Sequence, residues 1–184
     1  MKTALLIVDM QKDILKKIVG AEKNTVSNIQ ETLERCRKKG MPIIFLVRVH
    51  RKDGVDVERF RSKLFKENPY VIENSKGAEI LDELKPLPSE YIVAKRRFSG
   101  FFQSDLLMIL MRLQVTSLLV CGVQTPNCIR ATVTDALAYD YDVIVLEDAT
   151  AAQTPAIHQA NLLDMKNMGA EIKTVNQVFE EEEN

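Results

Sequence analysis

Short apolar runs alternate with longer stretches of helical spacing along almost the whole chain, and this alternation constrains the fold more than any other feature. The apolar runs cover residues 4–8, 43–49, 91–94, 118–121, 143–146 and 171–175. The helical stretches cover residues 25–39, 57–66, 78–84, 104–113, 128–138 and 156–168. Strands that alternate with helices form βαβ units, so the pattern predicts a parallel sheet covered by helices on both faces.

The chain has 184 residues, enough for one well-packed domain, and no Pro-rich or Ser/Gly-rich linker divides it. We expect a single domain over residues 1–178 and an acidic tail over residues 179–184, where like charges favour disorder. The least regular part, residues 51–90, is polar and long. It is interpreted equally well as a cover over a pocket or as a solvated connection between two strands.

Composition excludes several classes of partner. A formal net charge of -1, without an arginine-rich arm or zinc-finger spacing, gives no support for nucleic-acid binding. Membrane insertion is not expected either, because no apolar run approaches the ~20 residues that span a bilayer. The first apolar run meets Asp9 too early for a signal peptide, so we expect a cytoplasmic protein. Its three irregularly spaced cysteines argue against a disulfide framework.

The carboxyl ends of the predicted strands carry the polar residues of interest, because ligands of open parallel sheets bind there. Asp9 follows the first strand, the second strand ends near Arg48 and His50, and Lys95 follows the third. A dinucleotide site would need glycines where Asp9 stands, and neither a Gly-x-Gly-x-x-Gly nor a Walker pattern occurs. We therefore expect no cofactor.

Residues 122–128 (GVQTPNC) lead from a buried strand directly into a helix. Thr125 and Pro126 have the character of a helix cap and a first helical residue, which places Cys128 in the first turn. There the free N–H groups and the helix dipole are expected to lower the thiol pKa and favour the thiolate, which attacks carbonyl carbon. Cys128 is thus the candidate nucleophile, whereas Cys36 and Cys121 are expected to be inert.

An acid, a lysine and a cysteine are the residue types that covalent hydrolysis of an amide can use. Asp9 would accept the thiol proton of Cys128 and later activate water. Lys95 would hold the two negative groups together, since an aspartate and a thiolate otherwise repel each other.

The chain resembles the isochorismatase-like cysteine hydrolases, which include nicotinamidases, N-carbamoylsarcosine amidase and ureidoacrylate amidohydrolase. The resemblance rests on residues 6–11 (LIVDMQ), 95–101 (KRRFSGF), 122–128 (GVQTPNC), 135–136 (DA) and 148–150 (DAT). It implies that Asp9, Lys95 and Cys128 form a catalytic triad. It also implies a cis peptide bond between Val123 and Gln124, and an oxyanion hole made by the backbone N–H groups of Gln124 and Cys128.

The resemblance further implies a fold and an assembly. The fold is a Rossmann-like three-layer α/β/α sandwich whose six-stranded parallel sheet has the order 3-2-1-4-5-6, with Asp9 and the Cys128 turn side by side at the switch point. Lys95 then starts two strands away and must lean back toward them. The hydroxyl of Thr125 should point away from the Cys128 N–H, for which it would otherwise compete. Relatives are commonly oligomers, so a homodimer or homotetramer is expected.

Four residues are candidates for contact with a small amide-like substrate: Gln11, His50, Phe98 and Phe101. Each has an alternative. Gln11 can instead orient Asp9 or its loop, and phenylalanines near a strand end are more often core residues. Arg48, Arg96 and Arg97 can recognise a substrate carboxylate, although a surface role is favoured for each.

Nicotinamidases of this family hold a metal with an aspartate and two histidines. This chain has only His50 and His158, and no Asp-x-His follows the second strand. We therefore expect no metal site, a structural role for His158, and a lower chance of nicotinamidase activity.

The pattern as a whole predicts a hydrolase that cleaves a C–N bond of a small linear amide or ureide through a Cys128 thioester. One alternative is hydrolysis of a vinyl ether, the isochorismatase reaction, in which the family keeps the aspartate but does not need the thiol. Another alternative is a non-catalytic scaffold of the same fold. The sequence does not identify the substrate, because specificity depends on pocket shape from residues 51–90 and 98–102.

Overall fold

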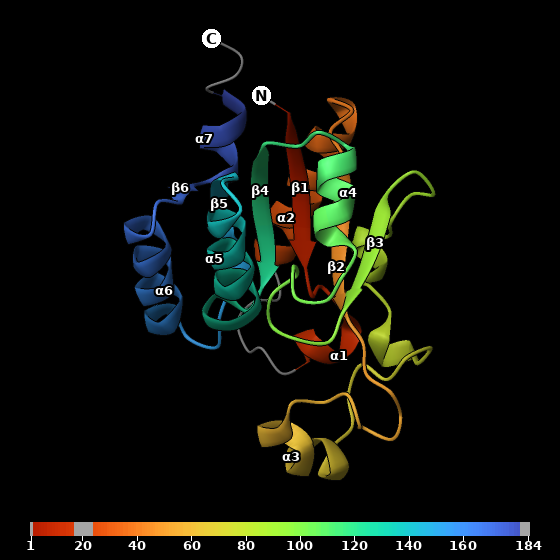
Figure 1. Ribbon diagram of the computed structural model, residues 1–184. Helices are drawn as coiled ribbons and strands as arrows, with labels where there is room; N and C mark the ends of the chain where they lie inside the picture. Colours follow the sequence, from red (N-terminus) through yellow and green to blue (C-terminus); the bar gives the residue numbers. More distant parts are fainter. Residues whose placement is uncertain (1, 17–23, 181–184) are drawn as a thin grey trace.

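A six-stranded parallel sheet of order β3-β2-β1-β4-β5-β6 forms the middle of the molecule (Figure 1). The computed structural model describes residues 2–16 and 24–180. The strands are β1 (Thr3–Val8), β2 (Ile43–Arg48), β3 (Tyr91–Lys95), β4 (Ser117–Val123), β5 (Asp142–Ala151) and β6 (Glu171–Lys173). The predicted sheet, its parallel pairing and its strand order are confirmed.

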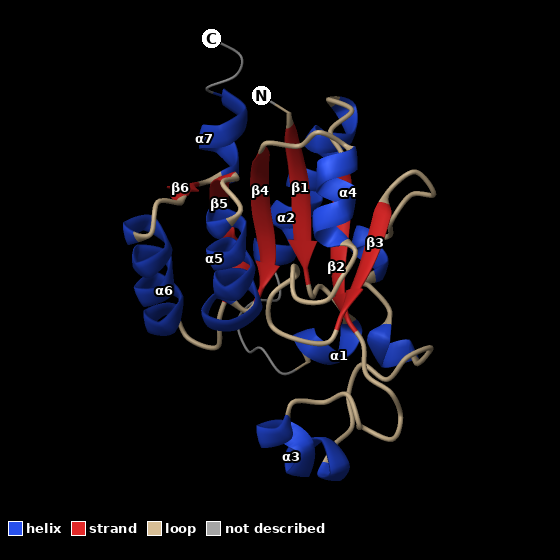
Figure 2. Ribbon diagram, viewed as in Figure 1, coloured by secondary structure: helices blue, strands red, loops and turns tan. Residues whose placement is uncertain are grey.

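Helices cover both faces of the sheet, which explains why its central strands, β1, β2 and β4, are buried along almost their whole length (Figure 2). Along β1, Leu6 and Val8 face one layer of the core, and Leu5 and Ile7 face the other. The first layer contains α4 (Leu106–Arg112), α5 (Arg130–Ala138) and α6 (Pro155–Asn167), and the second contains α2 (Asn24–Lys38) and α7 (Val175–Glu180). The sequence therefore specifies a three-layer sandwich.

The helix expected over residues 78–84 does not form. Two 3-10 turns, η2 (Lys76–Ala78) and η3 (Asp82–Leu84), lie there instead. Between them Ile80 pairs antiparallel with Gln11, and the Leu81 N–H donates to the Met10 carbonyl at 3.1 Å. These tertiary hydrogen bonds satisfy the backbone in an extended form, so helical spacing alone was misleading. The helix expected over residues 57–66 is a 3-10 turn, η1 (Arg59–Arg61), followed by α3 (Ser62–Glu67).

Two short helices were not expected. The helix α1 (Lys12–Leu15) follows the β1 turn, and α7 begins where a longer last strand was predicted. Asp148 Oδ1 accepts a hydrogen bond of 3.0 Å from the Val175 N–H, which starts α7. Phe179 is buried in the core, so ordered structure extends past the expected boundary at residue 178. Residues 181–184 of the expected tail lie outside the described residues.

Gly122 sets the approach of β4 to β1. Its φ is 112°, and a Cβ at this position would meet the Val8 carbonyl oxygen at 2.2 Å, so no other residue fits without displacing β1. The pairing of β4 with β5 shifts register between Val120 and Gly122. Both features bring the segment after β4 against the end of β1. Within residues 2–16 and 24–180, no helix has the length and apolar character needed to cross a membrane.

Candidate active site

The ends of three strands bring together the three residues of the predicted triad. Asp9 directly follows β1 with φ at 54°, a left-handed conformation that aspartate tolerates better than most residues. Lys95 is the last residue of β3, and Cys128 lies in the turn after β4. Lys95 leans back past β2, and its Nζ donates to Asp9 Oδ2 at 2.9 Å.

The Lys95–Asp9 ion pair is almost completely removed from water. The two side chains are 0% and 2% exposed, and Lys95 Nζ also donates to the Arg97 carbonyl at 3.2 Å. Asp9 Oδ1 is buried and accepts no hydrogen bond from any part of the chain that the structure describes. Asp9 therefore has one oxygen held by a cation and one oxygen free to accept a proton.

Cys128 sits in a π-helical turn, η4 (Thr125–Ile129), that leads into α5. The bond between Val123 and Gln124 is cis. The Thr125 hydroxyl hydrogen-bonds His158 Nδ1 at 2.8 Å and so points away from the Cys128 N–H, as expected. His158 Nε2 lies 3.1 Å from the Glu147 carbonyl, which accepts its proton and leaves Nδ1 to accept from Thr125. His158 thus has the structural role predicted for it.

The expected low thiol pKa is not found. Burial raises the pKa of Cys128 to about 12, and the negative charge of Asp9 acts in the same direction, while Lys95 and Arg48 lower it. The residue is 5% exposed, and its loss of hydration is the largest cause of the raised pKa. At neutral pH the resting site therefore holds a thiol beside an aspartate, not a thiolate.

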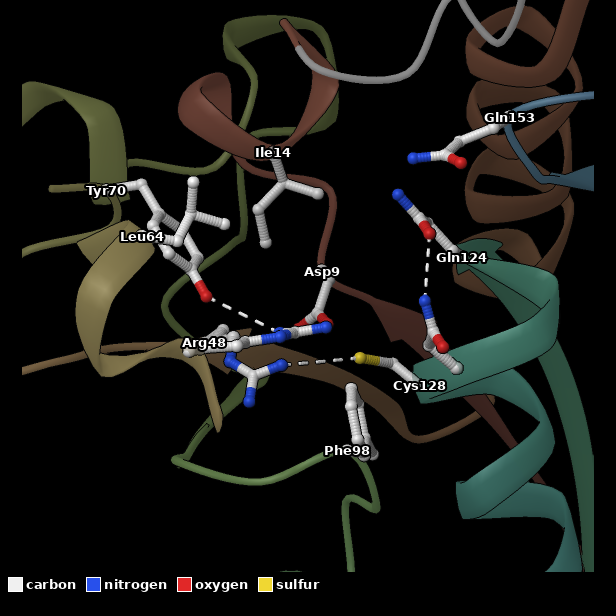
Figure 3. A pocket seen from close by; sticks show the side chains of 11 residues that line it. Asp9, Ile14, Arg48, Leu64, Tyr70, Phe98, Gln124, Cys128 and Gln153 are labelled. Carbon is white, nitrogen blue, oxygen red and sulfur yellow. Dashed lines mark hydrogen bonds between the residues drawn. The ribbon is translucent and has the colours of Figure 1, made fainter. Parts of the chain in front are cut away.

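A cavity of about 240 Å³ opens over Cys128 and Asp9 (Figure 3). Its remaining wall consists of two arginines, three side-chain amides and four apolar or aromatic groups: Arg48, Arg61, Gln124, Asn127, Gln153, Ile14, Leu64, Tyr70 and Phe98. Arg61, Leu64 and Tyr70 come from residues 51–90. That segment therefore walls a pocket, which was one of its two interpretations.

Arg48 is not the surface residue that was favoured. It is 2% exposed, and its Nη1 lies 3.9 Å from Cys128 Sγ. Its Nε donates to His50 Nε2 at 3.2 Å, and its Nη2 forms an ion pair with Glu58. Arg48 is the last residue of β2, whose other residues are all apolar, and this place at a strand end was the signal that could have put it in the site.

Three of the four expected substrate contacts do not line the cavity. Phe98 does line it. Phe101 packs in the core instead, with its ring centroid 5.4 Å from that of Tyr139. The Gln11 amide holds the backbone of Arg48, accepting from its N–H at 2.7 Å and donating to its carbonyl at 2.9 Å.

His50, the third, lies behind the cavity wall. It is 0% exposed, and burial, followed by the charge of Arg48, lowers its pKa to about 4. Its Nδ1 is 3.6 Å from Asp56 Oδ1. The neutral ring therefore supports Arg48 from behind and does not reach a substrate.

The residues around His50 do not fit a metal ion. The guanidinium of Arg48 already lies between His50 and Glu58, and a bound cation would face this fixed positive charge. Across the described ranges, 2–16 and 24–180, no three His, Cys, Asp or Glu residues are grouped closely enough to hold a metal.

The side-chain amides of Gln124, Asn127 and Gln153 were not predicted to line the cavity, although the backbone N–H of Gln124 was expected in the oxyanion hole. Asn127 Nδ2 donates to Gln124 Oε1 at 2.9 Å, so the two side chains form one polar part of the cavity wall. Gln153 follows β5, whose observed end is Ala151 and not residue 146 as predicted. A correct strand end would have identified Gln153 by the same rule that identified Asp9.

Comparisons with known proteins agree with this geometry. A family model described as the isochorismatase domain matches residues 3–177. A protein from Arabidopsis thaliana named probable inactive nicotinamidase is 44% identical, with 97% of this chain and 95% of that protein covered. Ureidoacrylate amidohydrolase RutB from Agrobacterium fabrum is 27% identical over 95% of this chain and 87% of its own. The crystal structure of an isochorismatase family protein from Desulfovibrio vulgaris superposes with a TM-score of 0.91, at 38% identity, covering 100% of this chain and 99% of that one.

Proposed function

The chain belongs to the isochorismatase family, and from this membership we propose that it is a cysteine hydrolase that cleaves the C–N bond of a small linear amide or ureide. One observation carries the proposal. The cavity floor places a thiol beside an aspartate that has a free oxygen on one side and a buried lysine on the other. Such a pair can move a proton and form a covalent bond within one cavity.

In the proposed mechanism, Asp9 Oδ1 takes the proton of the Cys128 thiol as Sγ attacks the carbonyl carbon. The C–N bond then breaks, and the leaving nitrogen takes the proton from Asp9 and departs as ammonia or an amine. Asp9 next removes a proton from water, whose oxygen attacks the Cys128 thioester. As the acid is released, the departing sulfur takes that proton from Asp9, which restores the thiol and the aspartate. Because the resting thiol has a pKa of about 12, proton transfer and attack are expected to occur together.

Two groups would stabilise charge during these steps. Lys95 keeps its proton and balances the negative charge that moves between Asp9 and the sulfur. The backbone N–H groups of Gln124 and Cys128 would donate to the oxyanion, where a single donor is typically worth about 3 kcal/mol of barrier. Both belong to the turn that the Thr125–His158 hydrogen bond supports.

A non-catalytic role is the second candidate, because the Arabidopsis relative that is 44% identical is named a probable inactive nicotinamidase. That name concerns nicotinamide. Hydrolysis of another amide is compatible with it, and the contact of Lys95 with Asp9 beside Cys128 supports a working site.

The test is to incubate the protein with a panel of small amides and ureides, nicotinamide included, and to measure ammonia release and the intact mass. We expect release with at least one compound, and a transient acyl adduct on Cys128. Cys128→Ala should lose both, whereas Cys36→Ala should keep both. Turnover that persists in Cys128→Ala would favour vinyl-ether hydrolysis, and a panel without turnover or adduct would favour the scaffold.

A further inference from the structure

Positive charge exceeds negative charge on the cavity wall. The ionisable residues that line it are Asp9, Arg48 and Arg61, apart from the thiol and the phenol. We propose that the substrate carries a carboxylate in addition to its scissile C–N bond, and that Arg61 binds this carboxylate. The inference rests on the proposed function and adds to it a substrate class, small amido or ureido acids.

Two of the three charges are already neutralised by partners outside the cavity. Asp9 is paired with Lys95 at 2.9 Å, and Arg48 is paired with Glu58, which is itself buried. Neither residue therefore calls for a charged ligand. The charge of Arg61 is the one left over.

Arg61 has aromatic neighbours and a phenol in place of an acid. Its guanidinium carbon lies 4.8 Å from the Phe98 ring centroid and 5.3 Å from that of Phe60, and its Nη1 is 3.4 Å from the Tyr70 hydroxyl. No carboxylate among the described residues forms an ion pair with it. Away from the cavity wall, five arginines have acidic partners: Arg35, Arg37, Arg51, Arg96 and Arg130. Arg59, Arg97 and Arg112 have no such partner among the described residues, but they do not line the cavity.

The position of Arg61 suits a small substrate. The two arginines share Phe98, because the guanidinium carbon of Arg48 lies 5.4 Å from the same ring centroid. Arg48 in turn reaches to 3.9 Å from Cys128 Sγ. Arg61 and Cys128 line the same cavity of about 240 Å³, and the proposal puts the carbonyl carbon of the substrate at Cys128 and its carboxylate at Arg61. The guanidinium fork matches a carboxylate, and the aromatic faces hold it in place.

Matched substrate pairs test the inference. Succinamate and 4-methylpentanamide, and likewise ureidoacetate and isobutylurea, differ by a carboxylate against an isopropyl group of similar shape. We expect the protein to prefer the anionic member of at least one pair by about tenfold or more in kcat/KM. Arg61→Gln should remove this preference by raising KM for the anion, with kcat and the neutral substrates little changed, and Arg61→Lys should restore part of it.

Arg59→Gln is the control, because Arg59 is an exposed residue of the same 3-10 turn and does not line the cavity. Equal treatment of the matched pairs, or an equal loss for both members in Arg61→Gln, would overturn the inference.

Binding separates this inference from the proposed function. Titration calorimetry of Cys128→Ala with succinamate and ureidoacetate measures binding without turnover. The double variant Cys128→Ala/Arg61→Gln should bind these anions tenfold or more weakly. If no compound is hydrolysed but the anions bind through Arg61, the proposed reaction fails and the anion site stands. If amides are hydrolysed but neither anion binds more tightly than its neutral partner, the anion site fails alone.

Discussion

The cavity is built by two regions of opposite character, the edge of the sheet and the segment of residues 51–90. At the sheet edge, Asp9, Lys95 and Cys128 are each 5% exposed or less, and strand ends fix their backbones. In the other segment, Phe65 and Tyr70 are buried, but Leu64 on the cavity wall is 53% exposed and the neighbouring Phe60 72% exposed. Under the proposed function, the buried edge would perform the chemistry and the more exposed wall would select the substrate.

Substitution of the proposed nucleophile, Cys128, should have the largest effect on activity. A small effect would show that the sheet edge does not perform the chemistry. Cys128→Ser replaces sulfur by a hydroxyl that Asp9 activates poorly, so we expect kcat/KM for amides to fall by about ten-thousandfold or more. The melting temperature should change little, since the side chains are similar in size. Ammonia release and thermal unfolding measure the two effects, and a change below tenfold in activity would remove Cys128 from the mechanism.

Loss of the buried cation should reduce both stability and activity. Lys95→Met leaves the Asp9 carboxylate unpaired at 2% side-chain exposure, and removal of one partner of a buried pair typically costs about 3–5 kcal/mol. Urea unfolding at pH 7 measures the change. The double variant Asp9→Asn/Lys95→Met is the control, and it should recover most of the stability while staying inactive. Full stability of Lys95→Met would contradict the tight pairing at the sheet edge.

Parallel pairing explains why the sheet edge could be predicted from sequence. Asp9 and the residues 122–128 follow apolar runs, and neighbouring parallel strands bring their carboxyl ends together whatever the loops do. The surroundings of Arg48 could not be found in the same way. Its partner Glu58 lies in an irregular segment, and no periodicity indicates where such a segment returns to the site.

The thiol pKa shows a second limit of sequence reasoning. A position in the first turn of a helix predicts free N–H groups and a favourable dipole, but the pKa of Cys128 also depends on how much water reaches it. The segments that close over Cys128 lie far away in the sequence, and their burial of the thiol decides the direction of the shift. The local sequence position pointed to Cys128 as the candidate nucleophile, but it did not predict that the resting side chain is a thiol.

Acid should weaken the support behind Arg48. The pKa of His50 is lowered from 6.5 to about 4 in the folded chain, mainly by burial. Between these values the unfolded chain binds the proton of His50 more tightly than the folded chain does. The contribution of His50 to the unfolding free energy is therefore fully present above pH 6.5. It falls as the pH is lowered and levels off below about 4. The shift corresponds to a loss on the order of 3 kcal/mol.

Urea unfolding from pH 7.5 to 4 measures this loss. His50→Asn keeps an acceptor for Arg48 Nε and removes the titration, so the difference between the two curves isolates His50 from His158, whose pKa burial also lowers. If the unfolding free energies of the parent protein and of His50→Asn fell equally with pH, the titration of His50 would not contribute to the loss of stability in acid.

Loss of the hydrogen bond between Thr125 and His158 of α6 should have a smaller effect on stability and activity. Thr125→Val keeps the side-chain shape but removes the hydroxyl that bonds His158, at a cost of about 1–2 kcal/mol in unfolding free energy. If that bond also holds the turn carrying Cys128, kcat should fall severalfold with KM unchanged. Thr134→Val is the control, because Thr134 is exposed and its hydroxyl bonds only within α5 and at long range to a sulfur. A change in KM alone would assign Thr125 to substrate binding.

A substitution in the segment of residues 51–90 should have the smallest effect on stability. It should also change KM most clearly without changing kcat. Leu64 lines the cavity but is 53% exposed, so Leu64→Ala removes contact with substrate and little of the core. We expect KM to rise a few-fold, kcat to stay within about twofold, and the unfolding free energy to change by less than about 1 kcal/mol. Val55→Ala is the matched control, since Val55 is 75% exposed and does not line the cavity. If Leu64→Ala instead lowered kcat strongly, residues 51–90 would take part in positioning the reacting atoms, and the division between a chemical edge and a selective segment would be wrong.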